Sequence, residues 1–258
     1  QSLAGEYSLE KRESDLEDLI EDKNTFLKIS SHQLRTPLTA IAGYLERVED
    51  EQYRYPAGEE TMMMVNKMRQ ITTGLQGTVN DLLSINSINS GQFAIVPNQL
   101  HDLKKLIEQI IVNKEFFFNS HKIQVRTIFR GEDFCAEIDY YKIRETFNNL
   151  IDNAVYYGKS KVVIAVIDKG KTIEIVISDD GISFDEETRK KFFKRFSRTT
   201  QTQKINPNGS GLGLYLGNLI VSKHNGTIDA KSKGPGHGSQ FIIEIPKKQP
   251  KKEDTKEV

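Results

Sequence analysis

A single histidine stands in a motif whose residue types could accept a phosphoryl group. The motif runs Ser31-His32-Gln33-Leu34-Arg35-Thr36-Pro37-Leu38. His32, Arg35 and Thr36 are three and four residues apart, so on a helix they share one face. Pro37 lacks an amide hydrogen, which frees the carbonyl of Gln33 and lets the helix bend just below His32. Such a helix suits a side chain that must meet two different partners, although a surface histidine beside a tolerated kink is the simpler alternative.

Two asparagines further along the chain could hold a divalent cation. Asn149 and Asn153 are four residues apart, so their amides face the same side of an expected helix. Mg²⁺ binds amide oxygens while it keeps waters and phosphate oxygens as further ligands. Asn153 is therefore the first choice of metal ligand, and Asn149 is a supporting contact. Taken alone, such a pair is more often a helix cap or a solvated face.

An acidic residue follows an apolar run that is typical of a strand. Asp179 precedes Asp180-Gly181, which is a turn signal. The carboxylate of Asp179 could accept a hydrogen from the amino group of adenine, where guanine offers a carbonyl instead. The residues therefore suit an adenine contact, but on Asp-Gly alone a simple hairpin turn is the commoner interpretation.

The strongest pocket signal is the run Gly209-Ser210-Gly211-Leu212-Gly213-Leu214. Glycine lets a backbone approach phosphate closely, and a helix that begins there presents free amides and the positive end of its dipole. The spacing matches neither the Walker nor the Rossmann pattern. Just before this run, the long polar segment over residues 199–208 is expected to be a mobile lid over a triphosphate.

Together these motifs resemble those of the sensor histidine kinases of two-component signalling, over nearly everything from residue 25 to residue 246. The resemblance implies that the neutral imidazole of His32 attacks the γ-phosphoryl group of ATP bound with Mg²⁺. The phosphoryl group would later pass to an aspartate on a response regulator receiver domain. The resemblance also implies that the hydroxyl of Thr36 orients a water that dephosphorylates the partner, so we expect phosphatase activity as well.

The same resemblance implies roles for further residues. Arg198 would reach the γ-phosphate, where a planar cation steadies charge during transfer, and Tyr157 would flank the nucleotide. Ser239, which follows Gly238, would lie close to the adenine side. The expected catalytic residues are His32, Gln33, Thr36 and Arg198. The expected nucleotide-binding residues are Asn149, Asn153, Tyr157, Asp179, Gly181, Gly209, Gly211, Gly213, Leu214 and Ser239, with Asn153 as the metal ligand.

Some positions depart from the family pattern. The residue after the histidine is commonly acidic but here is Gln33, whose amide can accept a hydrogen bond but cannot take a proton as a carboxylate does. Tyr156 stands where relatives often have lysine, and Ser183 stands where they usually have glycine. These departures keep a second function open, a nucleotide-sensing dimer with impaired kinase chemistry that acts mainly as a phosphatase or interaction scaffold. A plain ATPase with Glu145 as general base is a third, weaker hypothesis.

Bulk composition narrows the class of protein. The 258 residues exceed the usual size of one domain, so two modules are expected. The 36 basic and 36 acidic residues cancel, which argues against nucleic acid or an anionic membrane as partner. No apolar run approaches the roughly 20 residues that span a bilayer, so we expect a soluble, cytoplasmic piece that does not contact the membrane. Because the chain begins at Gln1 inside a helical pattern, we expect it to be the core of a longer protein, and membrane anchoring of that parent stays open.

Apolar spacing predicts a helical hairpin in the first third of the chain. Steps of seven run from Leu27 to Val48, after a stutter near Leu16, and a second helix is expected from Met64 to Ile85. A two-helix hairpin with a wide apolar face cannot cover itself. Pairing with a second copy into a homodimeric four-helix bundle is therefore expected, and packing against the second domain of the same chain is the alternative.

The pattern changes after a hinge expected at residues 87–91. Helices are expected over residues 103–118, 141–157 and 211–224, and strands over residues 122–129, 161–168, 172–178, 226–232 and 240–245. The predicted fold class is α+β, a hairpin followed by an α/β sandwich in which helices cover one face of a mixed sheet. By resemblance, this sandwich is a Bergerat ATP-binding fold. The expected domains are a coiled-coil signalling helix (1–24), the dimerisation and phosphotransfer hairpin (25–90), the ATP-binding domain (91–246) and a disordered tail (247–258).

Overall fold

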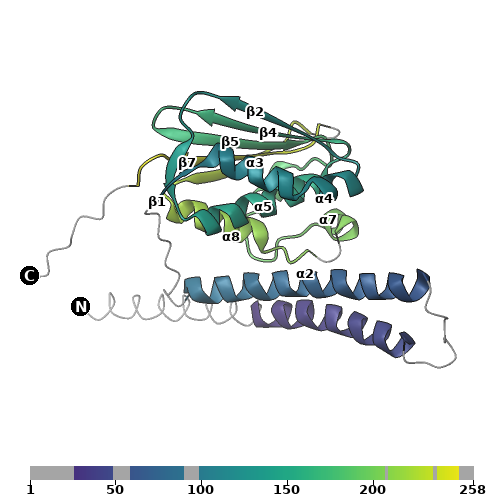
Figure 1. Ribbon diagram of the computed structural model, residues 1–258. Helices are drawn as coiled ribbons and strands as arrows, with labels where there is room; N and C mark the ends of the chain where they lie inside the picture. The colour runs from purple at the N-terminus through teal and green to yellow at the C-terminus, as the bar shows by residue number, and fades with distance from the viewer. Residues whose placement is uncertain (1–25, 49–58, 90–98, 207–208, 235–236, 250–258) are drawn as a thin grey trace, which may run out of the picture. The chain divides into compact units, whose positions relative to one another are not determined.

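The chain divides into two compact units, Gln1–Leu83 and Ser84–Val258, which are described separately. The computed structural model describes residues 26–48, 59–89, 99–206, 209–234 and 237–249 (Figure 1). The coiled-coil helix expected over residues 1–24 therefore lies outside the described residues. Within the described ranges, no helix is both long enough and apolar enough to cross a membrane.

Two helices form the described part of the hairpin. Residues 26–48 are helical without a break, Pro37 included, and α2 spans Glu59–Asn89. The predicted apolar row of α2 is shielded: Met64, Met68, Ile71 and Leu75 are half-buried, and Leu82 and Ile85 are buried. The predicted hairpin is confirmed. α2 extends to Asn89, so residues 87–89 of the expected hinge are helical, and residues 90–91 lie outside the described residues.

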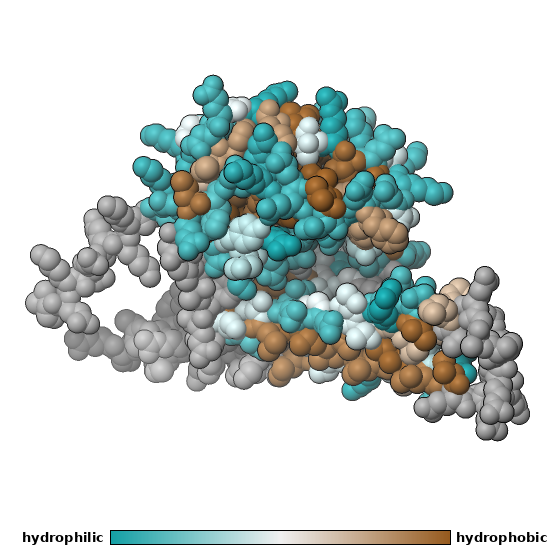
Figure 2. All heavy atoms as spheres, viewed as in Figure 1, coloured by the Kyte–Doolittle hydropathy of each residue, from teal (hydrophilic) through white to brown (hydrophobic). Residues whose placement is uncertain are grey.

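Many large apolar side chains of the hairpin remain exposed. Leu38 is 54% exposed, Val65 is 45% exposed and Leu83 is 58% exposed. The others are Leu27, Leu45, Val48, Met62, Met63 and Val79. Figure 2 shows brown, hydrophobic side chains gathered along the helices of this unit. Apolar surface of this extent is typical of a contact with another protein surface.

A five-stranded mixed sheet forms the centre of the second unit. Its strands are β2 (Gln124–Arg130), β4 (Lys161–Asp168), β5 (Thr172–Asp179), β7 (Gln240–Pro246) and β6 (Thr227–Lys231), in that spatial order. β2 pairs parallel with β4, and the other pairs are antiparallel. The predicted strands are confirmed with small differences at their ends.

Helices cover one face of this sheet, as Figure 1 shows. They include α3 (Leu103–Asn113), α5 (Tyr140–Tyr157) and α8 (Gly213–Lys223). The strands alternate accordingly, so that Val162, Ile164 and Val166 of β4 are fully buried while the residues between them are half-buried. This alternation of buried and less buried side chains is what a sheet with helices on one face requires. The predicted layered fold is confirmed.

The helix expected over residues 103–118 is two helices, because the chain leaves helical geometry at Lys114. α3 ends at Asn113, and α4 spans Glu115–Ser120. Lys114 has φ −105° and ψ 8°, and its ammonium group reaches the carboxylate of Asp152 on α5 at an Nζ–Oδ1 distance of 2.7 Å. The ion pair ties the junction of α3 and α4 to α5.

Several short elements have no counterpart in the sequence prediction. β1 (Gln99–Asp102) and β3 (Cys135–Ile138) pair antiparallel in a separate two-stranded sheet. α6 spans Glu186–Arg189, and α7 spans Thr200–Ile205. Each is only four to six residues long, too short to show a clear periodicity.

The predicted disorder of the tail was wrong for its first residues. The backbone N–H of Lys247 donates to the carbonyl of Lys171, and its ammonium group lies 2.8 Å from Oδ1 of Asp168 and 3.0 Å from Oδ2 of Asp133. The backbone N–H of Gln249 donates to the carboxylate of Glu137 at 2.8 Å. The paired partners hold residues 247–249, and residues 250–258 lie outside the described part of the chain.

His224 connects the end of α8 to the start of α5. Its ring is fully buried, its Nε2 accepts a hydrogen bond of 2.9 Å from the backbone N–H of Asp139, and its Nδ1 lies 2.7 Å from the carbonyl oxygen of Ile220. Because Nε2 accepts, Nδ1 must carry the hydrogen of a neutral ring. Burial lowers the pKa of His224 below its ordinary value.

We expect the chain to lose stability through His224 as the pH falls below about 6.5. In that range the unfolded chain protonates this imidazole while the folded chain keeps it neutral, so the unfolded state binds more protons. Thermal unfolding midpoints at pH 7.5 and 5.5 can be compared for the wild type and His224→Gln, whose amide can accept from Asp139 but does not titrate. The drop in midpoint should be larger for the wild type, and equal drops would contradict this expectation.

Candidate functional site

α5 and α8 lie side by side, and small residues set how closely they approach. A Cβ added to Gly217 of α8 would come within 3.2 Å of Cγ2 of Thr146. A Cβ added to Gly213, at the start of α8, would lie 3.4 Å from the side-chain amide of Asn149. The structure thus brings the end of the glycine run against Asn149, while Asn153 follows one turn later on α5 and is half-buried. Leu214 packs, partly buried, against the core.

Asp179 ends β5 and is bonded to two residues of the expected nucleotide set. Its Oδ1 accepts a hydrogen bond of 2.9 Å from the backbone N–H of Gly181, and its Oδ2 accepts from the hydroxyl of Ser239. The backbone N–H of Asp179 also donates to the carbonyl of Ser239 at 3.0 Å. Burial raises the pKa of Asp179, and these hydrogen bonds oppose the rise. Each oxygen has a second lone pair, so the carboxylate can still accept a hydrogen from a ligand.

Tyr157, at the end of α5, lies directly beside the loop that follows Asp179. The backbone N–H of Ile182 donates to the carbonyl of Tyr157 at 3.0 Å. A Cβ on Gly181 would overlap that same carbonyl oxygen, and a Cβ on Gly238 would overlap the carbonyl oxygen of Asp179. The close approach of three backbone segments therefore requires glycine at both positions.

Arg198 joins the glycine run to the segment before it. Its guanidinium donates to the backbone carbonyls of Thr202, at 3.2 Å, and of Asn206. A Cβ on Gly209 would lie 3.4 Å from Nη2 of Arg198, and a Cβ on Gly211 would lie 2.9 Å from its Cγ. Gly211 also has a φ of +71°, which disfavours any side chain there.

The same guanidinium also reaches α5. Burial raises the pKa of the Tyr157 hydroxyl, and the charge of Arg198 and its hydrogen bond to that hydroxyl oppose the rise. Arg198 therefore connects Tyr157, α7 and the two glycines Gly209 and Gly211. The structure brings these expected site residues together around one cation.

The segment expected to be a mobile lid contains a helix. Thr199 caps α7: its hydroxyl accepts from the backbone N–H of Thr202, and the hydroxyl of Thr202 accepts in return from the backbone N–H of Thr199. The signal in the sequence was this pair of threonines three residues apart, a variant of the capping box. Residues 207–208 of the expected lid lie outside the described residues.

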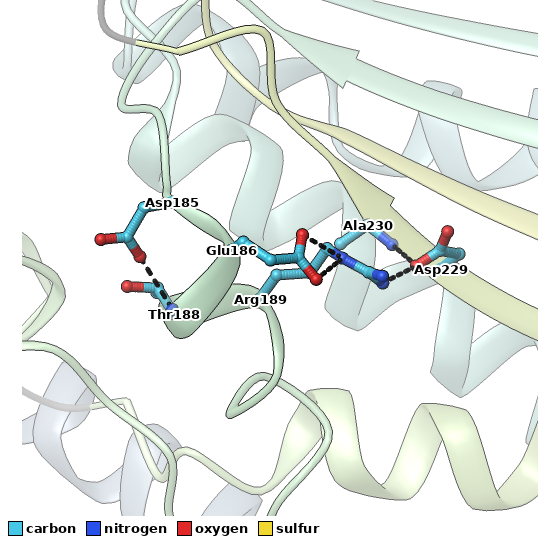
Figure 3. Close-up of polar contacts among 6 residues, drawn as sticks. All are labelled: Asp185, Glu186, Thr188, Arg189, Asp229 and Ala230. Atoms are coloured by element: carbon cyan, nitrogen blue, oxygen red, sulfur yellow. Dashed lines mark hydrogen bonds and ion pairs between the residues drawn. The ribbon is translucent and has the colours of Figure 1, made fainter.

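Along the chain, α6 (Glu186–Arg189) comes between the Asp179 loop and Arg198. Asp185 caps this helix by accepting from the backbone N–H of Thr188 at 2.8 Å. Arg189 pairs with Glu186 at 3.0 Å and with Asp229 of β6 at 2.6 Å, as Figure 3 shows. These pairs are exposed to solvent, so each contributes little to the stability of the fold.

Apolar contacts also hold the same segment. The rings of Phe184 and Phe192 meet at a centroid distance of 4.6 Å, and Phe192 lies 6.0 Å from Phe241 of β7. Phe192 and Phe193 both pack against the core. The chain that leads to Arg198 is thereby fixed to the sheet.

Two departures from the family pattern have structural counterparts. Tyr156 packs against Phe117 and His121 of the α4 region, at centroid distances of 5.5 and 5.4 Å. The sequence gave no sign of this aromatic cluster, because its partners are 35 or more residues away in the chain. The hydroxyl oxygen of Ser183 is buried, and among the described residues it has no hydrogen-bond partner.

The acceptor motif belongs to the first unit, whereas the expected nucleotide-binding residues belong to the second. His32 and Thr36 are exposed, and Gln33 is half-buried. The hydroxyl of Thr36 donates to the backbone carbonyl of His32 at 3.1 Å. Its oxygen can therefore still accept a hydrogen from water. The imidazole of His32 is accessible to a reaction partner.

Two family models match the chain in succession. The His Kinase A (phospho-acceptor) domain matches residues 22–91. The family described as Histidine kinase-, DNA gyrase B-, and HSP90-like ATPase matches residues 138–249. The first range contains His32, and the second contains all the expected nucleotide residues.

Individual proteins are similar over most of the chain. The sensor protein kinase WalK of Staphylococcus saprophyticus is 30% identical in an alignment of 233 residues, which covers 87% of this chain and 37% of that protein. The chain thus spans little more than a third of the length of this relative. The structure of the Acinetobacter baumannii histidine kinase AdeS matches with a TM-score of 0.67 and 24% identity, over 84% of this chain and 98% of AdeS.

A further structure holds two proteins. It is that of the histidine kinase ThkA in complex with the response regulator protein TrrA, and it matches with a TM-score of 0.60 and 22% identity over 84% of this chain and 59% of the matched chain. At these identities the likeness to AdeS and ThkA shows a shared fold.

Proposed function

Since the chain belongs to the sensor histidine kinases, we propose that it phosphorylates its own His32 with ATP and then passes the phosphoryl group to an aspartate of a response regulator. The observation that carries this proposal is the contact among Asp179, Gly181 and Ser239. A buried carboxylate held in this way suits recognition of the adenine amino group. The same polypeptide carries an exposed imidazole in the acceptor motif.

In the proposed reaction, an imidazole nitrogen of His32 forms a bond to the γ-phosphorus of ATP as the bond to the β,γ-bridging oxygen breaks and ADP leaves. Asn153, supported by Asn149, would hold Mg²⁺ through its amide oxygen, and the bound ion supplies charge neutralisation at the triphosphate. Arg198 would steady the charge on the transferred group. Nη2 of its guanidinium donates to the carbonyls of Thr202 and Asn206, and a guanidinium has five N–H donors in all.

We propose that the chain works as a homodimer. Leu38, Val65 and Leu83 are among the exposed apolar side chains of the hairpin, and a second copy of the hairpin would cover them in a four-helix bundle. The proposed partner for transfer is a receiver domain, and the structure that pairs ThkA with TrrA supports this class of partner.

We also propose phosphatase activity on that partner. Thr36 is exposed one helical turn from His32, and its oxygen can orient a water because its own hydrogen is donated to the His32 carbonyl. Tyr156, whose ring packs against Phe117 and His121, stands where relatives often have lysine. If the chain binds the phosphates of ATP weakly for this reason, phosphatase activity would exceed kinase activity. That outcome is the second candidate function, a nucleotide-sensing phosphatase.

One labelling experiment tests the kinase proposal. The chain is incubated with Mg-ATP labelled at the γ position, and the labelled protein is then treated with acid and with base. A phosphoramidate on histidine is expected to lose its label in acid and to keep it in base. Absence of label, or label that survives acid as a serine or threonine ester does, would contradict the proposal.

Gln33→Glu is expected to phosphorylate His32 about tenfold faster than the wild type. A carboxylate beside the imidazole can stabilise the positive charge that develops on the attacking ring, whereas the amide of Gln33 can accept a hydrogen bond from the ring but carries no negative charge. Initial rates should be measured from pH 6.5 to 8.5, with Gln33→Met as the control that keeps the length and removes the acceptor. A glutamate variant that is no faster anywhere in this range would show that Gln33 does not limit the reaction.

A further inference from the structure

Asp180 makes an unusual set of contacts for a residue in a turn. Its Oδ1 accepts hydrogen bonds from the backbone N–H groups of Lys159, Ser160 and Lys161, at 3.0, 2.9 and 3.0 Å. Its Oδ2 accepts from the hydroxyl of Ser160 at 2.5 Å. One side chain directly after β5 therefore binds Lys159 and Ser160, in the connection between α5 and β4, and the first residue of β4.

The charge of Asp180 suits this arrangement. Burial alone would raise the pKa of its carboxyl, but the hydrogen bonds from Ser160, Lys161 and Lys159 hold the pKa well below the ordinary value. The group is thus an anion in the folded chain at neutral pH. An ionised acceptor makes stronger hydrogen bonds with backbone N–H groups than a neutral one.

The held connection begins directly after Tyr157, and Asp180 directly follows Asp179. Between these neighbours the backbones touch, because the N–H of Ile182 donates to the carbonyl of Tyr157 and Gly181 has no room for a side chain beside that carbonyl. Asp180 adds side-chain hydrogen bonds to these backbone contacts. Its four hydrogen bonds fix the segment after Tyr157 relative to the strand end that carries Asp179.

We propose that Asp180 is a positioning residue for nucleotide selection, which holds the Asp179 carboxylate in the place where it can recognise adenine beside Tyr157. The proposal rests on the proposed function, in which this pocket binds ATP. Recognition of a base through one hydrogen bond depends on the position of the acceptor, because a donor–acceptor distance that grows from about 2.9 Å to beyond about 3.5 Å no longer makes a hydrogen bond. Loss of the Asp180 contacts should therefore reduce the preference for ATP over GTP in a chain that still folds.

The test compares the dissociation constants of Mg-ATP and Mg-GTP, measured by calorimetric titration of the whole chain. The ratio of the two constants is informative because partial unfolding weakens both nucleotides by the same factor. Asp180→Ala is expected to lose at least about tenfold of the ATP preference. Asp180→Asn should keep most of it, because the amide oxygen can still accept from the three backbone N–H groups.

Asp168 offers a matched control at the opposite end of β4. Its carboxylate also accepts from backbone N–H groups, that of Gly170 at 2.8 Å and that of Asp133 at 3.3 Å, and it pairs with Lys247. Asp168→Ala should lower thermal stability and leave the ATP-to-GTP ratio unchanged. If Asp180→Ala does not fold, Ser160→Ala removes one of the four donors and should give a smaller loss of preference.

Each outcome bears on a different claim. An unchanged ratio in Asp180→Ala, or an equal loss of preference in Asp168→Ala, would overturn the positioning role and leave the kinase proposal intact. A wild-type chain that binds no ATP, or binds GTP equally well, would overturn the proposed function of the pocket and with it the role of Asp180.

Discussion

His32→Ala is expected to reduce labelling of the chain by γ-labelled Mg-ATP at least about a thousandfold. The variant lacks the nucleophile, and other groups near the triphosphate only bind or orient it in the proposed mechanism. His32 is exposed, so the change should leave the fold of the hairpin intact. Acid-labile label per chain, measured over one hour beside the wild type, checks the expectation.

Two controls separate loss of chemistry from loss of structure. The affinity of His32→Ala for Mg-ATP should equal that of the wild type, because the expected nucleotide residues belong to the other unit. His101→Ala removes a histidine whose ring packs on Tyr140, far from the acceptor motif in the sequence, and should be labelled normally. Label that persists on the His32 variant would show that another residue accepts the phosphoryl group.

The pattern of residues along the chain was enough to predict long elements of this fold such as β4 and α2. The strand over residues 161–168 was predicted with the bounds that β4 has, because a continuous apolar run over residues 162–167 precedes the turn signal Lys169-Gly170. The row of α2 that includes Met68 and Leu75 was likewise visible in its spacing. In both cases the signal is local, since the pattern lies within a single element.

The missed features depend on partners that are distant in the sequence. Lys114 ends α3 beside Asp152, which is 38 residues away, and Asp180 binds an N–H group 21 residues away. The hydrogen bond between Ser239 and Asp179 spans 60 residues. Both of these residues were predicted for the pocket, but as separate motifs, because spacing within one motif carries no information about contacts between motifs.

The second large effect is expected at Gly181. A Cβ at this position would overlap the carbonyl oxygen of Tyr157 and would come within 2.6 Å of Cα of Gly158. Both obstacles are backbone atoms, so no side chain can rotate to make room. Gly181→Ala must push the β5 end away from α5, which breaks the hydrogen bond from Ile182 to Tyr157. We expect a loss of about 3 kcal/mol in the free energy of unfolding and at least about a hundredfold weaker binding of Mg-ATP.

Gly170 gives the complementary control for Gly181→Ala. It has a φ of +80° but open space around an added Cβ, so Gly170→Ala meets backbone strain without a clash and should cost only about 1–2 kcal/mol. Because Gly170 lies in the turn between β4 and β5, at the other end of both strands, nucleotide affinity should be unchanged in that variant. Thermal unfolding and Mg-ATP titration of both variants separate the two effects. If Gly181→Ala binds Mg-ATP as the wild type does, the spacing between Tyr157 and Asp179 does not matter for the pocket.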